Sequence, residues 1–168
     1  MFKKGQYVVY GSTGVCEVDE VGELANSVTM SNKMYYTLVP LYSKGSKVFT
    51  PIDSTKVKLR SVISKAEANE LMDSYDTIEL LEIPEEKRRE DVYKDAIGKC
   101  ECREWIRVLK TLYYYREKRK VDGKKITAID DKYLHMAEEN LFGELAITLE
   151  LDKEAVKELL HTKAAIQE

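Results

Sequence analysis

The sequence predicts a two-domain α+β protein, with a small antiparallel β-barrel in residues 1–62 and a compact all-α domain of four to five helices in residues 63–168. Two observations support this prediction. The first 60 residues contain short runs of β-branched and aromatic residues separated by turns, with no helical pattern between them. After Arg60 the apolar residues change to helical spacing. A chain of 168 residues has room for two small domains.

Four or five short strands are expected along the first domain, and four of them can be assigned to residue ranges. Residues 7–10 form an apolar strand, and after a glycine-containing turn residues 15–21 alternate partly with a period of two. Residues 35–42 are rich in Tyr, Thr, Val and Leu, which suit a pleated surface. Residues 47–50 form a further strand. Pro51 ends it or marks an exposed edge, because proline lacks the N–H that a sheet ladder needs.

The second half carries residues typical of helix starts. The predicted helices begin near Ser64, Pro84, Glu101, Thr127 and Asp152. Ser64 and Glu67 have the spacing of a capping box, in which each side chain bonds the other residue's backbone N–H. The third helix is expected from about 101 to 120. Its Trp105, Leu109 and Leu112 share one apolar face, so Trp105 is predicted to lie in the core.

Charge is distributed unevenly along the chain. The 27 Lys and Arg residues and 30 Asp and Glu residues give a net charge of −3. Residues 87–125, called the basic block here, hold 14 basic and 7 acidic residues, whereas residues 61–86 and 126–168 are acidic. Such clustering indicates something about partners rather than about fold. It is compatible with nucleic acid, bound mainly through phosphates with weak sequence specificity, and equally with a solvated basic face.

The candidate phosphate-binding residues lie on the second and third helices. On the third helix Arg107, Lys110 and Tyr114 recur at helical spacing, which places two cations and a hydroxyl on one stripe. The complete set of candidate DNA-binding residues is Arg88, Arg89, Arg107, Lys110, Tyr114, Arg116 and Arg119.

Nothing in the sequence favours an enzyme. Neither His135 nor His161 has a Ser, Cys or Asp placed beside it in the manner of a catalytic triad, and no phosphate-binding glycine motif occurs. Cys100 and Cys102 supply only half of a tetrahedral zinc shell. We therefore expect no catalytic residue, no cofactor, no metal and no small-molecule substrate.

The chain also lacks the signals of export and membrane insertion. No run approaches the ~18–20 apolar residues that span a bilayer, and no apolar segment follows the first lysines. Three cysteines cannot form a closed disulfide framework. We expect a cytoplasmic protein that does not bind membranes.

Four segments, in order along the chain, resemble one known family. Residues 2–10 read Phe-Lys-Lys-Gly-Gln-Tyr-Val-Val-Tyr and resemble the pattern F-x-x-G-D-x-V-V-Y. Residues 35–38 and 47–53 resemble the next two strands of that family. Residues 141–146, Leu-Phe-Gly-Glu-Leu-Ala, resemble its L-x-G-E-L-A motif. The family is the CarD/CdnL family of bacterial transcription regulators.

This resemblance implies both fold and function. It implies a Tudor-like N-terminal domain that docks on the β subunit of RNA polymerase, a domain type also found in transcription-repair coupling factor. It also implies a helical domain that touches promoter DNA near the upstream edge of the melted region. Such a protein has no enzymatic activity or cofactor and stabilises the open promoter complex. We expect this chain to be monomeric. The polymerase-facing residues carried over are Val48, Phe49, Thr50 and Pro51.

The sequence departs from the family pattern at two places. Several members carry arginine where Phe49 lies, so the contact here is expected to be more apolar. Members also have a minor-groove tryptophan shortly before the tyrosine that matches Tyr93. Here Arg88 and Arg89 occupy that region and are expected to replace it. The alternative interpretation is an adaptor whose basic block meets an acidic protein rather than DNA.

Overall fold

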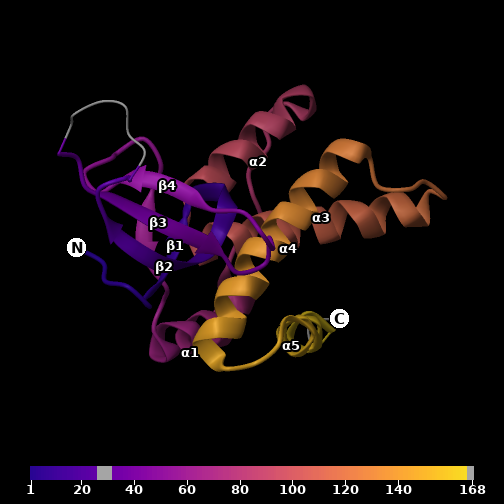
Figure 1. Ribbon diagram of the computed structural model, residues 1–168. Helices are drawn as coiled ribbons and strands as arrows, with labels where there is room; N and C mark the ends of the chain where they lie inside the picture. Colours follow the sequence, from indigo (N-terminus) through magenta and orange to yellow (C-terminus); the bar gives the residue numbers. More distant parts are fainter. Residues whose placement is uncertain (26–31, 166–168) are drawn as a thin grey trace. The chain divides into compact units, whose positions relative to one another are not determined.

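The computed structural model describes residues 1–25 and 32–165. The chain divides into two compact units, Met1–Val62 and Ile63–Glu168. The first unit contains the strands and the second contains the helices (Figure 1). The predicted α+β layout, with strands first and helices after, is confirmed.

The N-terminal unit is a five-stranded antiparallel sheet with the strand order β4-β3-β2-β1-β5. The strands are β1 (Tyr7–Tyr10), β2 (Gly14–Gly22), β3 (Tyr35–Pro40), β4 (Val48–Pro51) and β5 (Leu59–Ser61). β5 was not predicted as a separate strand, because three residues are too short to show a period. β4 and β5 form the two edges of the strand order, so β4 pairs only with β3.

One face of this sheet builds a small core. The buried side chains are Val8, Cys16, Val18, Tyr36 and Leu38, with Phe2, Tyr10, Val21, Val48 and Leu59 packed against them. Phe2 also donates its backbone N–H to the Tyr36 hydroxyl at 3.1 Å. A bulge between Val18 and Glu20 interrupts the pairing of β2 with β3, which leaves Asp19 as the extra residue.

The helical unit contains five α-helices among the residues described. These are α1 (Lys65–Asp73), α2 (Arg89–Gly98), α3 (Cys102–Val121), α4 (Ala128–Leu149) and α5 (Lys153–Ala165). None of these described helices has both the length and the apolar character that a bilayer span requires. The capping box of Ser64 and Glu67 is confirmed at the start of α1. Thr127 and Asp152 likewise accept backbone N–H bonds at the starts of α4 and α5.

The second helix begins later than predicted. Pro84 precedes it in non-helical chain, a 3-10 turn follows at Glu86–Arg88, and α2 starts only at Arg89. Arg88 has φ −105° and ψ 12°, which interrupts the helical geometry before α2. The prediction that one helix runs from Pro84 to Gly98 was therefore wrong in its first five residues.

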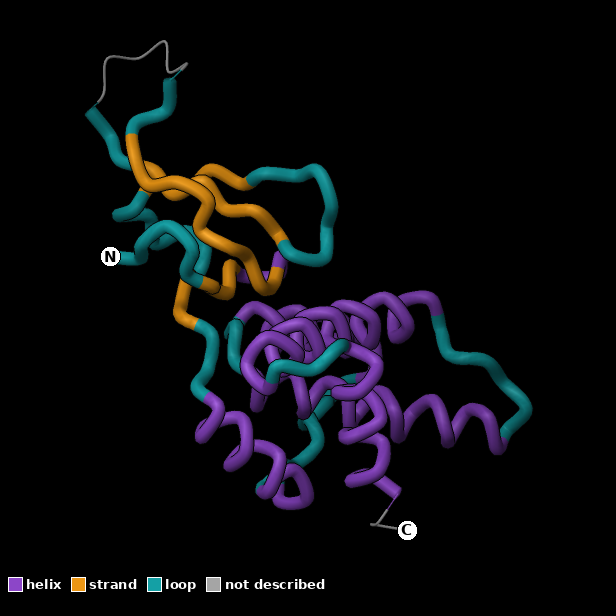
Figure 2. Tube along the Cα trace, turned by 60° about the horizontal axis from the view of Figure 1, so that its bottom comes forward, coloured by secondary structure: helices purple, strands orange, loops and turns teal. Residues whose placement is uncertain are grey.

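The two long helices α3 and α4 pack against each other at the centre of the helical unit. Their connection lies at the right-hand end of this unit (Figures 1 and 2). Trp105 is fully buried on α3, as predicted, and donates its indole N–H to the Ile97 carbonyl at 3.3 Å. An apolar stripe of α4, which consists of Leu134, Ala137, Leu141 and Leu145, is buried as well. α2 contributes Tyr93, Ala96 and Ile97 to the same core.

Ile63, the first residue of the helical unit, is hydrogen-bonded to α4 through both its N–H and its carbonyl group. Its N–H donates to Glu144 Oε1 at 2.9 Å, and its carbonyl accepts from Thr148 Oγ1 at 3.0 Å. The other oxygen of Glu144 accepts from the Cys102 thiol at 3.0 Å. Glu144, which belongs to the motif at residues 141–146, therefore ties the start of the unit to both long helices.

Candidate functional site

One edge of the N-terminal sheet is β4, and its side chains alternate between the core and solvent. Val48 packs against the core and Thr50 is buried. Phe49 points the other way and leaves 52% of its surface exposed, more than any other ring in the described part of this unit. The structure thus separates the four predicted contact residues: Phe49 and Pro51 face outward, whereas Val48 and Thr50 serve mainly the fold.

The register of β4 shows which backbone groups face away from the sheet. The Ile52 N–H bonds to the Met34 carbonyl at 3.1 Å, just beyond the last paired residues. Because hydrogen-bonded and non-bonded pairs alternate along antiparallel strands, Thr50 and Val48 also bond toward β3. The N–H and C=O groups of Phe49 then point outward, and Pro51 adds only a carbonyl. The edge therefore offers one complete donor–acceptor pair, at Phe49.

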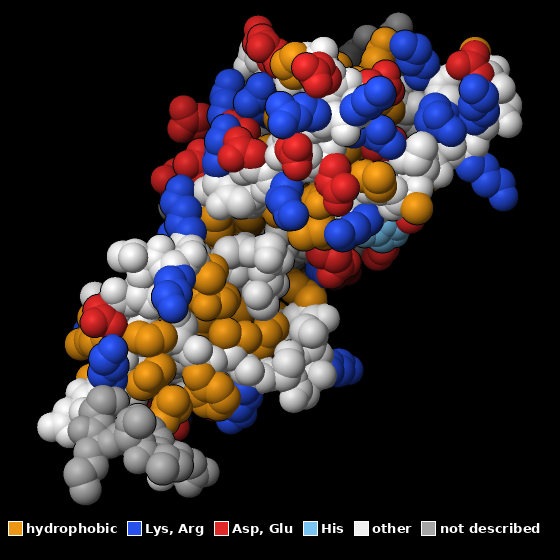
Figure 3. Space-filling model, turned by 90° about the horizontal axis from the view of Figure 1, so that it is seen from above, with side chains coloured by type: hydrophobic (Ala, Val, Ile, Leu, Met, Phe, Trp, Pro, Cys, Tyr) orange, Lys and Arg blue, Asp and Glu red, His pale blue; other side chains and the backbone are white. Residues whose placement is uncertain are grey.

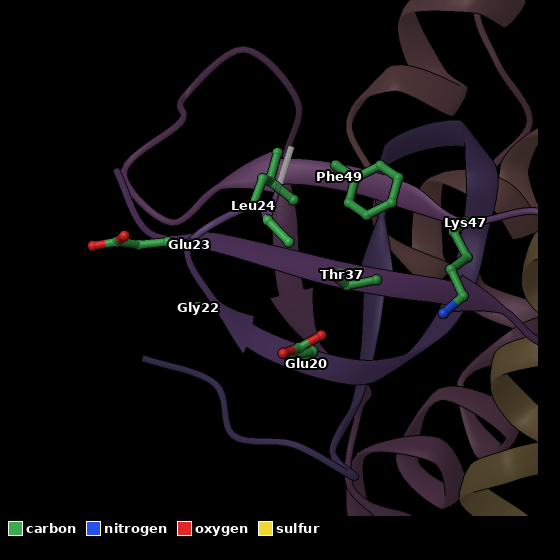
Figure 4. A pocket seen from close by; sticks show the side chains of 8 residues that line it. Glu20, Gly22, Glu23, Leu24, Thr37, Lys47 and Phe49 are labelled. Atoms are coloured by element: carbon green, nitrogen blue, oxygen red, sulfur yellow. The ribbon is translucent and has the colours of Figure 1, made fainter. Parts of the chain in front are cut away.

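A shallow groove of about 460 Å³ lies beside this edge. Glu20, Thr37 and Phe49 lie side by side on β2, β3 and β4 and form its floor (Figure 4). Lys47 closes one end, where it bonds the bulged Asp19 at 3.0 Å. That hydrogen bond and the positive charge of Lys47 lower the pKa of Asp19. The edge is thus an apolar contact bordered by charges, as is typical of a protein-docking surface.

Arg89 of the basic block has an internal partner. Its Nε donates to Asp130 Oδ1 at 3.0 Å, and Asp130 is almost completely buried near the start of α4. The same guanidinium also donates to the Glu86 carbonyl and the Thr127 hydroxyl. Arg89 therefore joins α2 to α4, whereas its neighbour Arg88 is exposed beside an open groove of about 440 Å³.

Two cations of the predicted α3 stripe also have internal partners. Arg107 bonds Glu104 at 3.2 Å and the carbonyls of Glu79 and Leu80. The Lys110 ammonium donates to the carbonyls of Tyr75 and Ile78 at 2.9 and 2.6 Å. Partial burial lowers the pKa of Lys110. These side chains fasten the segment between α1 and α2 onto α3, which a helical-wheel argument does not reveal.

The remaining predicted residues lie toward the C-terminal end of α3. Tyr114 is exposed, Arg116 lies over the Tyr113 ring at 4.9 Å, and Arg119 Nε donates to the Lys125 carbonyl at 2.7 Å. This end leads into the connection at residues 122–127. The structure therefore spreads the predicted set over several surfaces instead of one stripe.

Four lysines outside the predicted set surround this connection. Lys118 and Lys120 end α3, and Lys124 and Lys125 follow it. All four are exposed, and in the part of the chain that the structure describes no ion pair or side-chain hydrogen bond neutralises them. The sequence did contain a signal for these exposed lysines, because they flank an Asp-Gly turn between two predicted helices.

The cysteines and histidines occupy unrelated positions. Cys100 and Cys102 are buried at the α2–α3 turn, where Cys100 has a φ of 58°. His135 is exposed near the start of α4, and its pKa is raised mainly by the backbone of Asp131. His161 packs edge-on against Tyr113 at 5.8 Å. Across residues 1–25 and 32–165, no group of three or more His, Cys, Asp or Glu side chains is arranged to hold a metal ion.

The strand order defines the N-terminal unit as a small antiparallel β domain with β4 at one edge. Residues 2–63 match the family described as the CarD-like/TRCF RID domain. The N-terminal unit therefore belongs to this family, as its strand motifs predicted, and the match indicates RNA polymerase binding and a role in transcription regulation. No curated protein matches the chain.

Proposed function

We propose that the protein is a transcription regulator that docks on the β subunit of RNA polymerase through β4. The observation that carries this proposal is the combination of the CarD-like/TRCF RID match with an edge strand that is open to pairing. An extended segment of the polymerase adds to the sheet beside β4, with one of its residues opposite Phe49. The Phe49 ring and Pro51 then cover apolar partner side chains.

We further propose that the helical unit contacts promoter DNA and thereby stabilises the open complex. The support is the family-like motif at residues 141–146 and the clustering of positive charge in the basic block. Binding is mainly electrostatic and weakly sequence-specific. The protein acts in the bacterial cytoplasm as a non-enzymatic monomer, without metal or cofactor.

Replacement of Phe49 by Asp tests the polymerase contact in the full-length chain. A charge at the centre of an apolar contact commonly costs ~2 kcal/mol or more, which is at least a 30-fold loss of affinity. Tyr7→Asp is the matched control, since Tyr7 is an exposed ring on β1 rather than on the edge strand. Affinity for immobilised polymerase is measured for both. Equal affinities for the Phe49→Asp and Tyr7→Asp variants would sink the proposal.

An adaptor that binds an acidic protein through the basic block is the second candidate. The charge of residues 87–125 is compatible with either partner. DNA affinity that falls steeply with added salt supports the DNA-binding function, whereas no DNA binding at low salt supports the adaptor.

A further inference from the structure

We infer that the connection between α3 and α4, rather than the predicted stripe on α3, is the main phosphate-binding element of the helical unit. We call residues 116–125 the basic tip. This inference rests on the proposed DNA contact and specifies where that contact lies. It follows from three features: which cations have internal partners, where the others lie, and how rigidly they are held.

The first feature is that three cations of the predicted DNA-binding set already have internal hydrogen-bond partners. Arg89, Arg107 and Lys110 each donate two or more hydrogen bonds to groups of the same unit. A phosphate would have to replace those bonds before it could use these cations. A direct phosphate contact by these side chains therefore carries the cost of the internal hydrogen bonds it breaks.

The second feature is the concentration of exposed charge at the basic tip. Among residues 116–125 six side chains are basic and only Glu117 and Asp122 are acidic. Figure 3 shows Lys and Arg side chains at the right-hand end of the helical unit, where Figures 1 and 2 place the α3–α4 connection. Because the connection lies at the end of a helical hairpin, it can approach a duplex without a clash from α1 or α5.

The third feature is the defined backbone of the basic tip. Gly123 has a φ of 71° and donates its N–H to the Lys120 carbonyl, while Lys124 N–H donates to the Arg119 carbonyl. This is the Schellman pattern that ends a helix. Arg119 Nε bonds the Lys125 carbonyl and closes the turn on its other side. The lysines thus project from an ordered turn, so that little backbone entropy is lost when they bind.

The occupant that fits this surface is a nucleic-acid backbone. Six cations lie within residues 116–125, and Val121 is the one apolar side chain inside this described segment. Docking on a protein generally uses a central apolar or aromatic contact, which the basic tip lacks. Regularly spaced phosphates need only positive charge. An acidic protein is the competing occupant, and the test below distinguishes it.

The test compares two full-length variants of equal net charge. The tip variant carries Lys120→Gln, Lys124→Gln and Lys125→Gln, and the control variant carries Lys44→Gln, Lys65→Gln and Lys94→Gln at exposed sites elsewhere. Affinity for a promoter duplex is measured across a salt titration. The tip variant is expected to lose at least tenfold in affinity at low salt, and its slope should become shallower by about 0.9 per lost phosphate contact. The control should keep the slope of the wild type.

A gain of charge provides a second test that does not depend on loss of folding. Val121 is 88% exposed at the end of α3, so Val121→Lys adds a cation to the basic tip without disturbing packing. It should raise DNA affinity and steepen the slope by about one unit. Leu159→Lys, at an exposed position of α5, is the control.

The outcomes separate this inference from the proposed function. If the wild type binds DNA but both tip changes leave the slope unaltered, the inference is overturned while the DNA contact stands. If the wild type binds no DNA at low salt, both fail. If polymerase capture falls in the tip variant while DNA affinity is unchanged, the basic tip binds an acidic protein and the inference is again overturned.

Discussion

Arg88 and Arg89 are adjacent and chemically identical, yet they have different surroundings. Arg89 donates to the buried carboxylate of Asp130, and the hydrogen bond holds the pKa of its guanidinium above the ordinary value. Arg88 has no such partner among the described residues and is exposed. Sequence position alone gives both the same expected role. The difference depends on α4, which lies some 40 residues away in the chain.

Replacing the two arginines separately should therefore give different results. Arg89→Ala leaves the Asp130 carboxylate nearly buried without its partner, which should cost ~2–3 kcal/mol of the free energy of unfolding. Arg88→Ala should change stability by less than ~0.5 kcal/mol. Urea denaturation of both variants measures this. Equal stabilities would mean that the Arg89–Asp130 pair does not hold α2 to α4.

Cys16 makes the stability of the sheet sensitive to alkaline pH. Burial in the core raises the pKa of its thiol from 9.0 to about 11. The neutral thiol contributes its full stability below pH 9. Between pH 9 and about 11 the unfolded chain loses its proton first, so stability falls as pH rises. The loss should be on the order of 2 kcal/mol.

Comparison with Cys16→Ala isolates this contribution. The free energy of unfolding is measured at pH 8 and pH 10.5 for both proteins. The wild type should lose more stability over this interval than the variant does. If the difference in unfolding free energy between the wild type and Cys16→Ala is the same at pH 8 and pH 10.5, Cys16 is not the source of the pH dependence.

At the scale of elements, the packing of α3 was the most predictable feature. Trp105, Leu109 and Leu112 have helical spacing, and all three are buried against α2 and α4. Trp105→Ala removes the largest fully buried side chain and should cost ~3 kcal/mol or more of stability. Its thermal melt is compared with that of Tyr114→Ala, an exposed ring on the same helix. An unchanged melting temperature would place Trp105 outside the core.

The strands and most helix starts were predictable because their signals are local. The capping box at Ser64, the strand at residues 7–10 and the exposed edge at Pro51 depend on neighbours in the chain. The partners of the basic block are not local: Lys110 bonds carbonyls about 30 residues away. Helical spacing shows which face a cation shares, but not what else is packed on that face. For this reason the predicted stripe failed to reveal which charges are exposed.

At the scale of the whole molecule, the two units have separate cores and separate proposed tasks. The sheet unit has its own buried cluster around Val8 and Leu38, and the helical unit has one around Trp105. Polymerase affinity and DNA affinity should therefore respond to different substitutions. The losses of binding free energy from substitutions in the two units should be independent of each other. A double variant that combines Phe49→Asp with the tip changes would show this as two independent losses.

The chain segment that connects the two units is very short. β5 ends at Ser61, and Ile63 is already bonded to α4 on both sides of its backbone. Only Val62 lies between, so the two attachment points are separated by ~7 Å of chain at most. Insertion of a ten-residue Gly-Ser segment after Val62 should leave polymerase capture unchanged and shorten the lifetime of the open complex. An unchanged lifetime would show that the length of the connection does not matter.

The hydrogen bonds at Ile63 therefore have a consequence for binding strength. A helical unit tethered so closely to a polymerase-bound sheet experiences nearby DNA at an effective concentration in the millimolar range. Under that condition even a weak, salt-sensitive grip on phosphates is occupied most of the time. The same contact is weaker on DNA that no bound polymerase holds nearby. The hydrogen bonds of Glu144 and Thr148 to Ile63 thus help to set how strongly the proposed DNA contact would depend on polymerase binding.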